Sequence, residues 1–221
     1  MKALKALAAL LSYPAAELVE ALPEIRAAIA TERRIGRRDR VALDSLIDEL
    51  AAADLLDAQE GYVALFDRGR ATSLNLYEHV HGDSRDRGQA MVDLAQVYAR
   101  GGLDLSTREL PDYLPVLLEY LSTRPFAEVE EMLRDCAHLL RSIGEALARR
   151  DSGYAVVLAT LLAVAGESPG LGKGGVEEGS SNEKSLDEEW AEEPVLFGLG
   201  CGDARSASSR PQPIRFVRKV A

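Results

Sequence analysis

Apolar residues recur at every third or fourth position through the first 165 residues, and this spacing restricts the possible folds more than any other feature of the chain. Ala and Leu dominate the same region, whereas the alternating Val, Ile and Thr runs that are typical of strands are nearly absent. The sequence therefore predicts an all-α fold, with a single helical-bundle domain over residues 1–165.

The periodic segments also predict where the helices lie. Residues 1–11 resemble the start of a signal peptide, but Pro14 and an amphipathic stretch follow in place of a cleavage site, so we expect a core helix there. In residues 40–67, Asp54 is suited to cap a restart, which predicts two helices that meet near Ala53. Further helices are expected over residues 15–32, where Pro23 is a potential break, 84–100, 111–121, 125–150 and 152–165.

The composition changes abruptly at Gly166, where Gly, Ser and Glu replace the apolar pattern. Such a segment buries too little apolar surface to offset its chain entropy, which predicts a flexible tail over residues 166–221. Within it, Trp190 and residues 194–197 form an isolated acidic-aromatic patch, for which docking on the domain, docking on a partner and no docking all stay open. The Gly-rich residues 170–175 lack the strand and helix that flank a phosphate-binding loop.

The chain is acidic, with a formal net charge of −10, of which residues 1–166 contribute −7. An acidic surface repels nucleic acid and anionic lipid headgroups and favours basic peptides, so we expect no nucleic-acid partner. Residues 33–40 are the one basic cluster of the domain, and Gly36 within them is expected to end the preceding helix. This favours a solvated turn over an anion-binding patch or a nucleic-acid-binding regulator.

The two cysteines, Cys136 and Cys201, are too few for a disulfide framework or a Cys-rich metal site. A reducing cytoplasmic location is the simplest interpretation. No run of apolar residues approaches the about 20 that are needed to cross a bilayer, so we expect no stable membrane insertion.

The densest group of His, acidic and Arg side chains lies in residues 76–88. Within it, His79 and His81 form a His-X-His pair, which binds zinc or iron when a third ligand is available. No third ligand is evident, because His138 lies in a predicted helix among core positions. A metal-dependent helical hydrolase that uses His79 and His81 is therefore the alternative hypothesis, and we predict no catalytic residues, no metal and no cofactor.

Residues 111–121 carry two carboxylates in a predicted helix that starts at Pro111. At about 100° per residue, Leu114, Leu117, Leu118 and Leu121 share one face of this helix. Asp112 and Glu119 share the opposite face, so both carboxylates are expected to project from the same side.

Several of these segments together resemble the NarJ-type nitrate reductase molybdenum cofactor assembly chaperones, a branch of the TorD/DmsD-like redox enzyme maturation proteins. The resemblance runs through residues 62–66, 73–91 and 109–121 and continues in the tail at residues 186–195. It implies a TorD-like, all-helical, non-catalytic cytoplasmic protein that binds the apo catalytic subunit of nitrate reductase through its N-terminal peptide. Such a chaperone holds the subunit open for molybdenum cofactor insertion before membrane attachment, and the resemblance implies the cofactor delivery machinery as a further partner.

A basic, helical client peptide requires an apolar groove with carboxylates at its rim. On this interpretation Tyr113, Leu117 and Tyr120 line the groove, and Asp112 and Glu119 lie at its edge. The facing wall comprises Glu78, His79 and His81, with Tyr77 beside them. The alternative is that Tyr113, Leu117 and Tyr120 are core residues. If His79 or His81 takes part in recognition, the affinity should change between about pH 5 and 8.

Overall fold

The structure is a computed structural model, and it describes residues 1–81, 85–103, 105, 109–168 and 170. The chain divides into two units, residues 1–175 and 176–221, and all the described residues belong to the first. The predictions for Trp190 and for residues 194–197 lie outside the described residues. The boundary at residue 165 and the flexible tail remain predictions.

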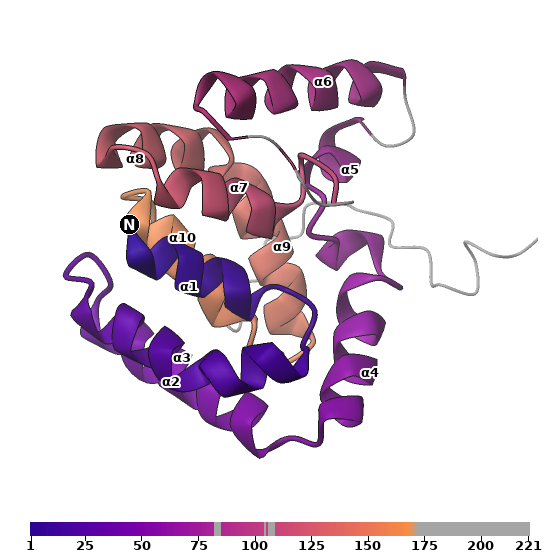
Figure 1. Ribbon diagram of the computed structural model, residues 1–221. Coiled ribbons are helices and arrows are strands. Elements are labelled where there is room, and N and C mark those ends of the chain that lie inside the picture. Colours follow the sequence, from indigo (N-terminus) through magenta and orange to yellow (C-terminus); the bar gives the residue numbers. More distant parts are fainter. Residues whose placement is uncertain (82–84, 104, 106–108, 169, 171–221) are drawn as a thin grey trace, which may run out of the picture. The chain divides into compact units, whose positions relative to one another are not determined.

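The described part of the chain is all-α, as predicted (Figure 1). Its only β-type pairing is an isolated bridge between Asn75 and Tyr113. The elements are α1 (Lys2–Leu10), α2 (Ala16–Thr31), α3 (Arg37–Ala52), α4 (Leu55–Phe66), the 3-10 turn η1 (Arg70–Thr72), α5 (Leu76–His81), α6 (Arg85–Arg100), α7 (Leu114–Ser122), α8 (Phe126–Asp135), α9 (Ala137–Arg149) and α10 (Ala155–Val164).

Two helices occupy the centre of the bundle. Helix α1 packs against α2 and α7 and buries both its leucine and its alanine side chains, which confirms that residues 1–11 contain a core helix. Helix α10 is apolar on all sides and packs against α3, α8 and α9. A helix that is apolar all round must be surrounded by protein. Among the described helices, none has the length and the apolar character required to cross a membrane.

The predicted boundary between α3 and α4 is confirmed. Asp54 precedes α4, and its side chain accepts a hydrogen bond from the backbone N–H of Leu56 at 2.9 Å. This bond satisfies one of the free N–H groups of the first helical turn. Pro23, in contrast, does not split α2, which continues through it with the proline ring exposed.

The prediction that Gly36 ends a helix is wrong. Helix α2 ends at Thr31, and Gly36 instead precedes α3 with an extended backbone. The turn between them is fixed by Ile35, whose side chain is fully buried against the core. A positive φ at the glycine is therefore not needed here.

The single helix predicted over residues 125–150 is also wrong. The chain turns at Cys136, which separates α8 from α9. Helix α8 buries Val129 and Leu133, and α9 buries its own stripe, which includes Leu140 and Ile143. The break lets each helix turn its own apolar stripe toward the core. Burial raises the pKa of the Cys136 thiol to about 11, as expected for a structural cysteine.

Candidate functional site

A short antiparallel contact joins the chain before α5 to the chain before α7. Asn75 and Tyr113 form the isolated β-bridge, and Leu76 donates its backbone N–H to the carbonyl oxygen of Asp112 at 3.0 Å. These contacts fix the two segments side by side. As a result, the first turn of α5 lies against Asp112.

The Asp112 side chain is completely buried at this point. Its Oδ2 atom accepts the backbone N–H of Tyr77 at 3.1 Å and lies 3.7 Å from Nη2 of Arg87, in the first turn of α6. Burial raises the pKa of Asp112, while the Tyr77 N–H and the Arg87 charge oppose the rise. Asp112 therefore connects α5, α6 and the start of α7.

The polar side chains of α5 are engaged within the same group. The Oε1 atom of Glu78 lies 3.3 Å from Arg87 Nη2, and its Oε2 atom accepts a hydrogen bond from the Ser73 hydroxyl. Nε2 of His79 lies 2.9 Å from the backbone oxygen of Ser73, which can only accept, so this nitrogen carries the donated hydrogen. We call Ser73, Glu78, His79, Arg87 and Asp112 the polar cluster. Its contacts hold α5 and α6 on the bundle.

This geometry does not support the hydrolase alternative. The His79 ring is hydrogen-bonded to the backbone, and the His81 ring packs edge-on against Tyr77 with centroids 5.7 Å apart. In the part of the chain that the structure describes, no three His, Cys, Asp or Glu side chains are grouped as a metal site. His138 is exposed on α9.

The prediction that Asp112 and Glu119 project from one side of a helix is wrong. Helix α7 begins at Leu114, so Asp112 lies before it. If the helix began at Pro111, the ring of Pro115 would clash with the Pro111 carbonyl four residues earlier. With the later start, Pro115 falls in the first turn, where it is tolerated. Glu119 is exposed, whereas Asp112 is buried.

The three residues predicted to line the groove have different environments. Leu117 is a core residue with 2 % of its surface exposed, and Tyr120 is buried against Tyr98 with ring centroids 4.8 Å apart. Tyr113 is half-buried, and its hydroxyl lies 2.9 Å from that of Tyr62. Leu117 and Tyr120 therefore pack as core residues, which was the alternative interpretation of their positions. Their role in recognition remains a prediction.

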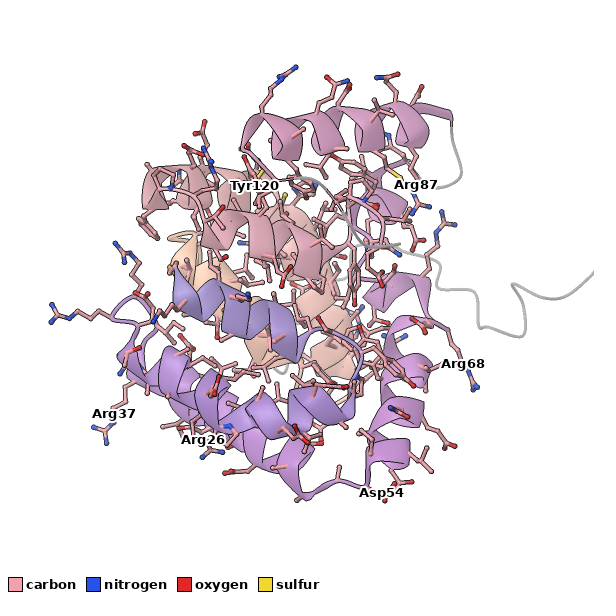
Figure 2. The ribbon with its side chains drawn as sticks, in the orientation of Figure 1. Arg26, Arg37, Asp54, Arg68, Arg87 and Tyr120 are labelled. Carbon is pink, nitrogen blue, oxygen red and sulfur yellow. The ribbon has the colours of Figure 1, made fainter. Side chains whose placement is uncertain are left out.

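Glu119 and Tyr120 nevertheless line a common cavity of about 230 Å³, which we call the Glu119 cavity. Its wall also contains the exposed Lys5 of α1, so the cavity carries one group of each charge. The remaining lining residues are Tyr98, Leu103, Leu105, Val116, Ser122 and Thr123. Figure 2 shows Tyr120 near one end of α6 and Arg87 near the other, so the Glu119 cavity and the polar cluster lie at opposite ends of this helix.

A larger hollow of about 650 Å³ lies along the outer face of α4, and we call it the α4 hollow. Its apolar part includes two exposed large apolar side chains, Tyr13 at 48 % and Leu56 at 68 %. Asp57 and Glu60 contribute carboxylates, and a Cβ atom at Gly61 would meet no other atom within 4 Å. The other lining residues are Gln59, Val63, Ala64 and Arg68.

The sequence contained a signal for this hollow that our predictions did not use. Tyr62 and Phe66 define the buried face of α4, and they are four residues apart. Leu56 falls about 120° away from Tyr62 on the same helix, outside that face. A single exposed apolar residue is common, but Leu56 shares one hollow with the exposed Tyr13, and exposed apolar residues that are grouped suit a partner.

The sequence profile of the family described as nitrate reductase delta subunit matches residues 11–160. A nitrate reductase molybdenum cofactor assembly chaperone, NarJ of Escherichia coli strain K12, is 44% identical over 220 residues, covering 96% of this chain and 91% of the relative.

Two further relatives carry similar names. The probable nitrate reductase molybdenum cofactor assembly chaperone NarW of the same strain is 42% identical over 203 residues, covering 89% of this chain and 84% of the relative. The probable chaperone NarJ of Bacillus subtilis strain 168 is 32% identical over 159 residues, covering 72% and 85%.

Proposed function

Because the chain belongs to the nitrate reductase delta subunit family, we propose that it is an assembly chaperone that binds the apo catalytic subunit of nitrate reductase for molybdenum cofactor insertion. The names of its relatives support this role. We further propose that recognition occurs through the N-terminal peptide of that subunit, without catalysis and in the cytoplasm. The cofactor delivery machinery is the second partner of the same proposal.

The observation that carries the proposal is the α4 hollow. A helical peptide binds by inserting apolar side chains into a groove, and rim charges orient it and raise its association rate. The α4 hollow offers Tyr13 and Leu56 as apolar contacts and Asp57 and Glu60 as acidic ones. These features suit a peptide that is both amphipathic and basic.

The packing of α4 explains why this face is free. The helix is attached to the bundle by Tyr62 and Phe66, which bury their rings against each other and against Tyr154. Gln59 adds a hydrogen bond from its side-chain amide to the Pro14 carbonyl at 2.8 Å. Figure 1 shows α4 at the side of the bundle, with its outer face not covered by another described helix.

The residues predicted from the sequence define a second location for the peptide. In this arrangement one apolar side chain enters the Glu119 cavity beside Tyr120, and Glu119 binds a basic residue. A cavity of about 230 Å³ accommodates a single side chain, whereas several anchors require the larger α4 hollow. Tyr77, Glu78, His79, His81 and Asp112 would then act by holding the surrounding helices.

The two locations can be separated by peptide titration. The probe is the N-terminal peptide of the nitrate reductase catalytic subunit from the same organism, and the full chain is titrated by calorimetry. Gly61→Lys places a long cation in the α4 hollow, and the exchange of glycine for lysine within a helix is itself favourable. Gly88→Lys in α6 is the matched control, because a Cβ atom there also meets nothing within 4 Å.

We expect Gly61→Lys to weaken the affinity at least about tenfold through steric and charge repulsion, and Gly88→Lys to leave it unchanged. Glu119→Gln, with Glu131→Gln on α8 as its control, tests the second location. Normal affinity of Gly61→Lys together with weakened affinity of Glu119→Gln would move the peptide to the Glu119 cavity. If the unaltered chain does not bind the peptide, recognition through the N-terminal segment is refuted.

A further inference from the structure

The turn between α2 and α3 concentrates positive charge on an otherwise acidic protein. Residues 32–40 contain five arginines and two carboxylates, in a chain with a net charge of −10. The turn stands at the edge of the bundle, and Figure 2 shows Arg37 directed away from the helices. We call Arg33, Arg34, Arg37 and Arg38, all of them exposed, the arginine turn.

Two of the five arginines have structural roles. Arg40 donates from Nε to the carbonyl oxygen of Ile35 at 2.9 Å, which closes the turn. Arg34 stacks over the Phe126 ring at 3.9 Å and pairs with Glu32 at 3.3 Å. The fold of the turn is therefore explained without the remaining arginines.

Arg33, Arg37 and Arg38 are exposed and form no ion pair with the described residues. Two described carboxylates lie nearby. Glu32 forms an ion pair with Arg34, and the Asp39 carboxylate lies close to Gly36 at the start of α3. Lys2 extends the positive charge, because it lines the same surface hollow as Thr31 at the end of α2. Exposed charges of one sign attract an oppositely charged surface, and most strongly where no carboxylate neutralises them.

In place of the solvated turn expected from the sequence, we propose that the arginine turn is a contact site for an anionic lipid surface. None of the hollows described above is lined by these arginines, and a turn that projects from the bundle suits contact with a broad surface. A flat bilayer can touch a projecting turn while the acidic remainder of the domain stays at a distance. Beyond about 8 Å, physiological salt largely screens the repulsion between that remainder and the lipid.

Nucleic acid fits these observations less well. A duplex carries one charge per about 1.7 Å and offers several turns of continuous negative surface, so it would also meet the acidic faces of the domain. In contrast, each arginine of a basic segment next to an anionic bilayer strengthens peripheral binding roughly fivefold. The contact is peripheral and reversible, and it is independent of the chaperone role.

The test is co-sedimentation of the full chain with vesicles at low and at physiological salt. The vesicles contain phosphatidylcholine and phosphatidylglycerol at about three to one, with pure phosphatidylcholine as the neutral comparison. The variant is Arg33→Gln/Arg37→Gln/Arg38→Gln. The matched control is Arg70→Gln/Arg100→Gln/Arg149→Gln, which removes three exposed arginines from η1, α6 and α9 and changes the net charge equally.

We expect binding to the anionic vesicles that falls with added salt and is absent on the neutral ones. The arginine-turn variant should bind on the order of a hundredfold more weakly, and the control variant should bind like the unaltered chain. Circular dichroism of both variants excludes loss of folding as the cause. Absence of binding at low salt, an equal loss in both variants, or salt-sensitive retention on DNA with no vesicle binding would each overturn the proposal.

Discussion

Removal of Arg87 should destabilise the protein in a pH-dependent manner, because this residue provides the charge that faces the buried Asp112. The Arg87 Nη2 atom lies 3.7 Å from Asp112 Oδ2, and the Asp112 side chain has no exposed surface. At an effective dielectric constant of about 20, the attraction between the two charges is about 4–5 kcal/mol. Desolvation of the guanidinium offsets part of this, and Arg87 retains 17% exposure, so we expect Arg87→Met to cost about 2–3 kcal/mol at pH 7.

The sign of the pH dependence follows from the pKa of Asp112. Burial raises this pKa in the folded protein, and the Arg87 charge partly opposes the rise. Arg87→Met removes that opposition, so the folded chain holds the Asp112 proton more tightly still, relative to the unfolded chain. Protonation then favours folding. The lost stability is therefore fully apparent above the folded pKa of the variant and becomes smaller as the pH falls through it.

Urea unfolding at pH 7 and pH 5 measures both effects. Arg134→Met is the control, because Arg134 pairs with Glu130 on the exposed face of α8, where such a pair contributes about 0.3–0.5 kcal/mol. Adding Asp112→Asn to Arg87→Met should restore most of the loss, since the uncompensated charge is then absent. Equal losses in Arg87→Met and Arg134→Met, or a deficit that does not change with pH, would refute this reasoning.

Two further predictions concern hydroxyl and imidazole groups near the proposed surfaces. Tyr62→Phe should lower the free energy of unfolding in urea by about 1 kcal/mol, because the buried Tyr62 hydroxyl lies 2.8 Å from the Leu11 carbonyl and 2.9 Å from the Tyr113 hydroxyl. Because the two hydroxyls share a hydrogen bond, Tyr62→Phe combined with Tyr113→Phe should cost less than the sum of the two single changes. If His79 or His81 contacts the client, the calorimetric affinity for the peptide should vary between about pH 5 and 8, and a flat profile would exclude both imidazoles from recognition.

The fold class could be predicted from the sequence because periodicity reports which face of each segment is buried. The α3–α4 boundary could be predicted from the local sequence, because the side-chain oxygen of Asp54 can cap the helix that follows. The break at Cys136 could not be predicted in this way. No proline or glycine marks it, and it depends on how α8 and α9 pack against the rest of the bundle.

The candidate site was predicted less well, because chemical character does not reveal exposure. Asp112 and Glu119 are both carboxylates, yet one lies in the polar cluster and the other lines a cavity. The two prolines around Asp112 contained the necessary information, since they restrict where α7 can begin. The expected combination of apolar and acidic groups is present on α4, on residues that the sequence patterns did not select.

The position of α6 connects these findings. Arg87 in its first turn joins the polar cluster, and Tyr98 in its last turn donates its hydroxyl to the Pro111 carbonyl at 2.8 Å. The two residues are eleven positions apart, which places them roughly 16 Å apart along the helix. Both anchors attach α6 to the segment around Asp112. We therefore expect substitutions of Glu78 and Arg87 in the polar cluster to lower stability while leaving client affinity unchanged as long as the chain remains folded. Substitutions in the α4 hollow should reduce affinity while leaving stability unchanged, so the two measurements together separate support of the fold from contact with the client.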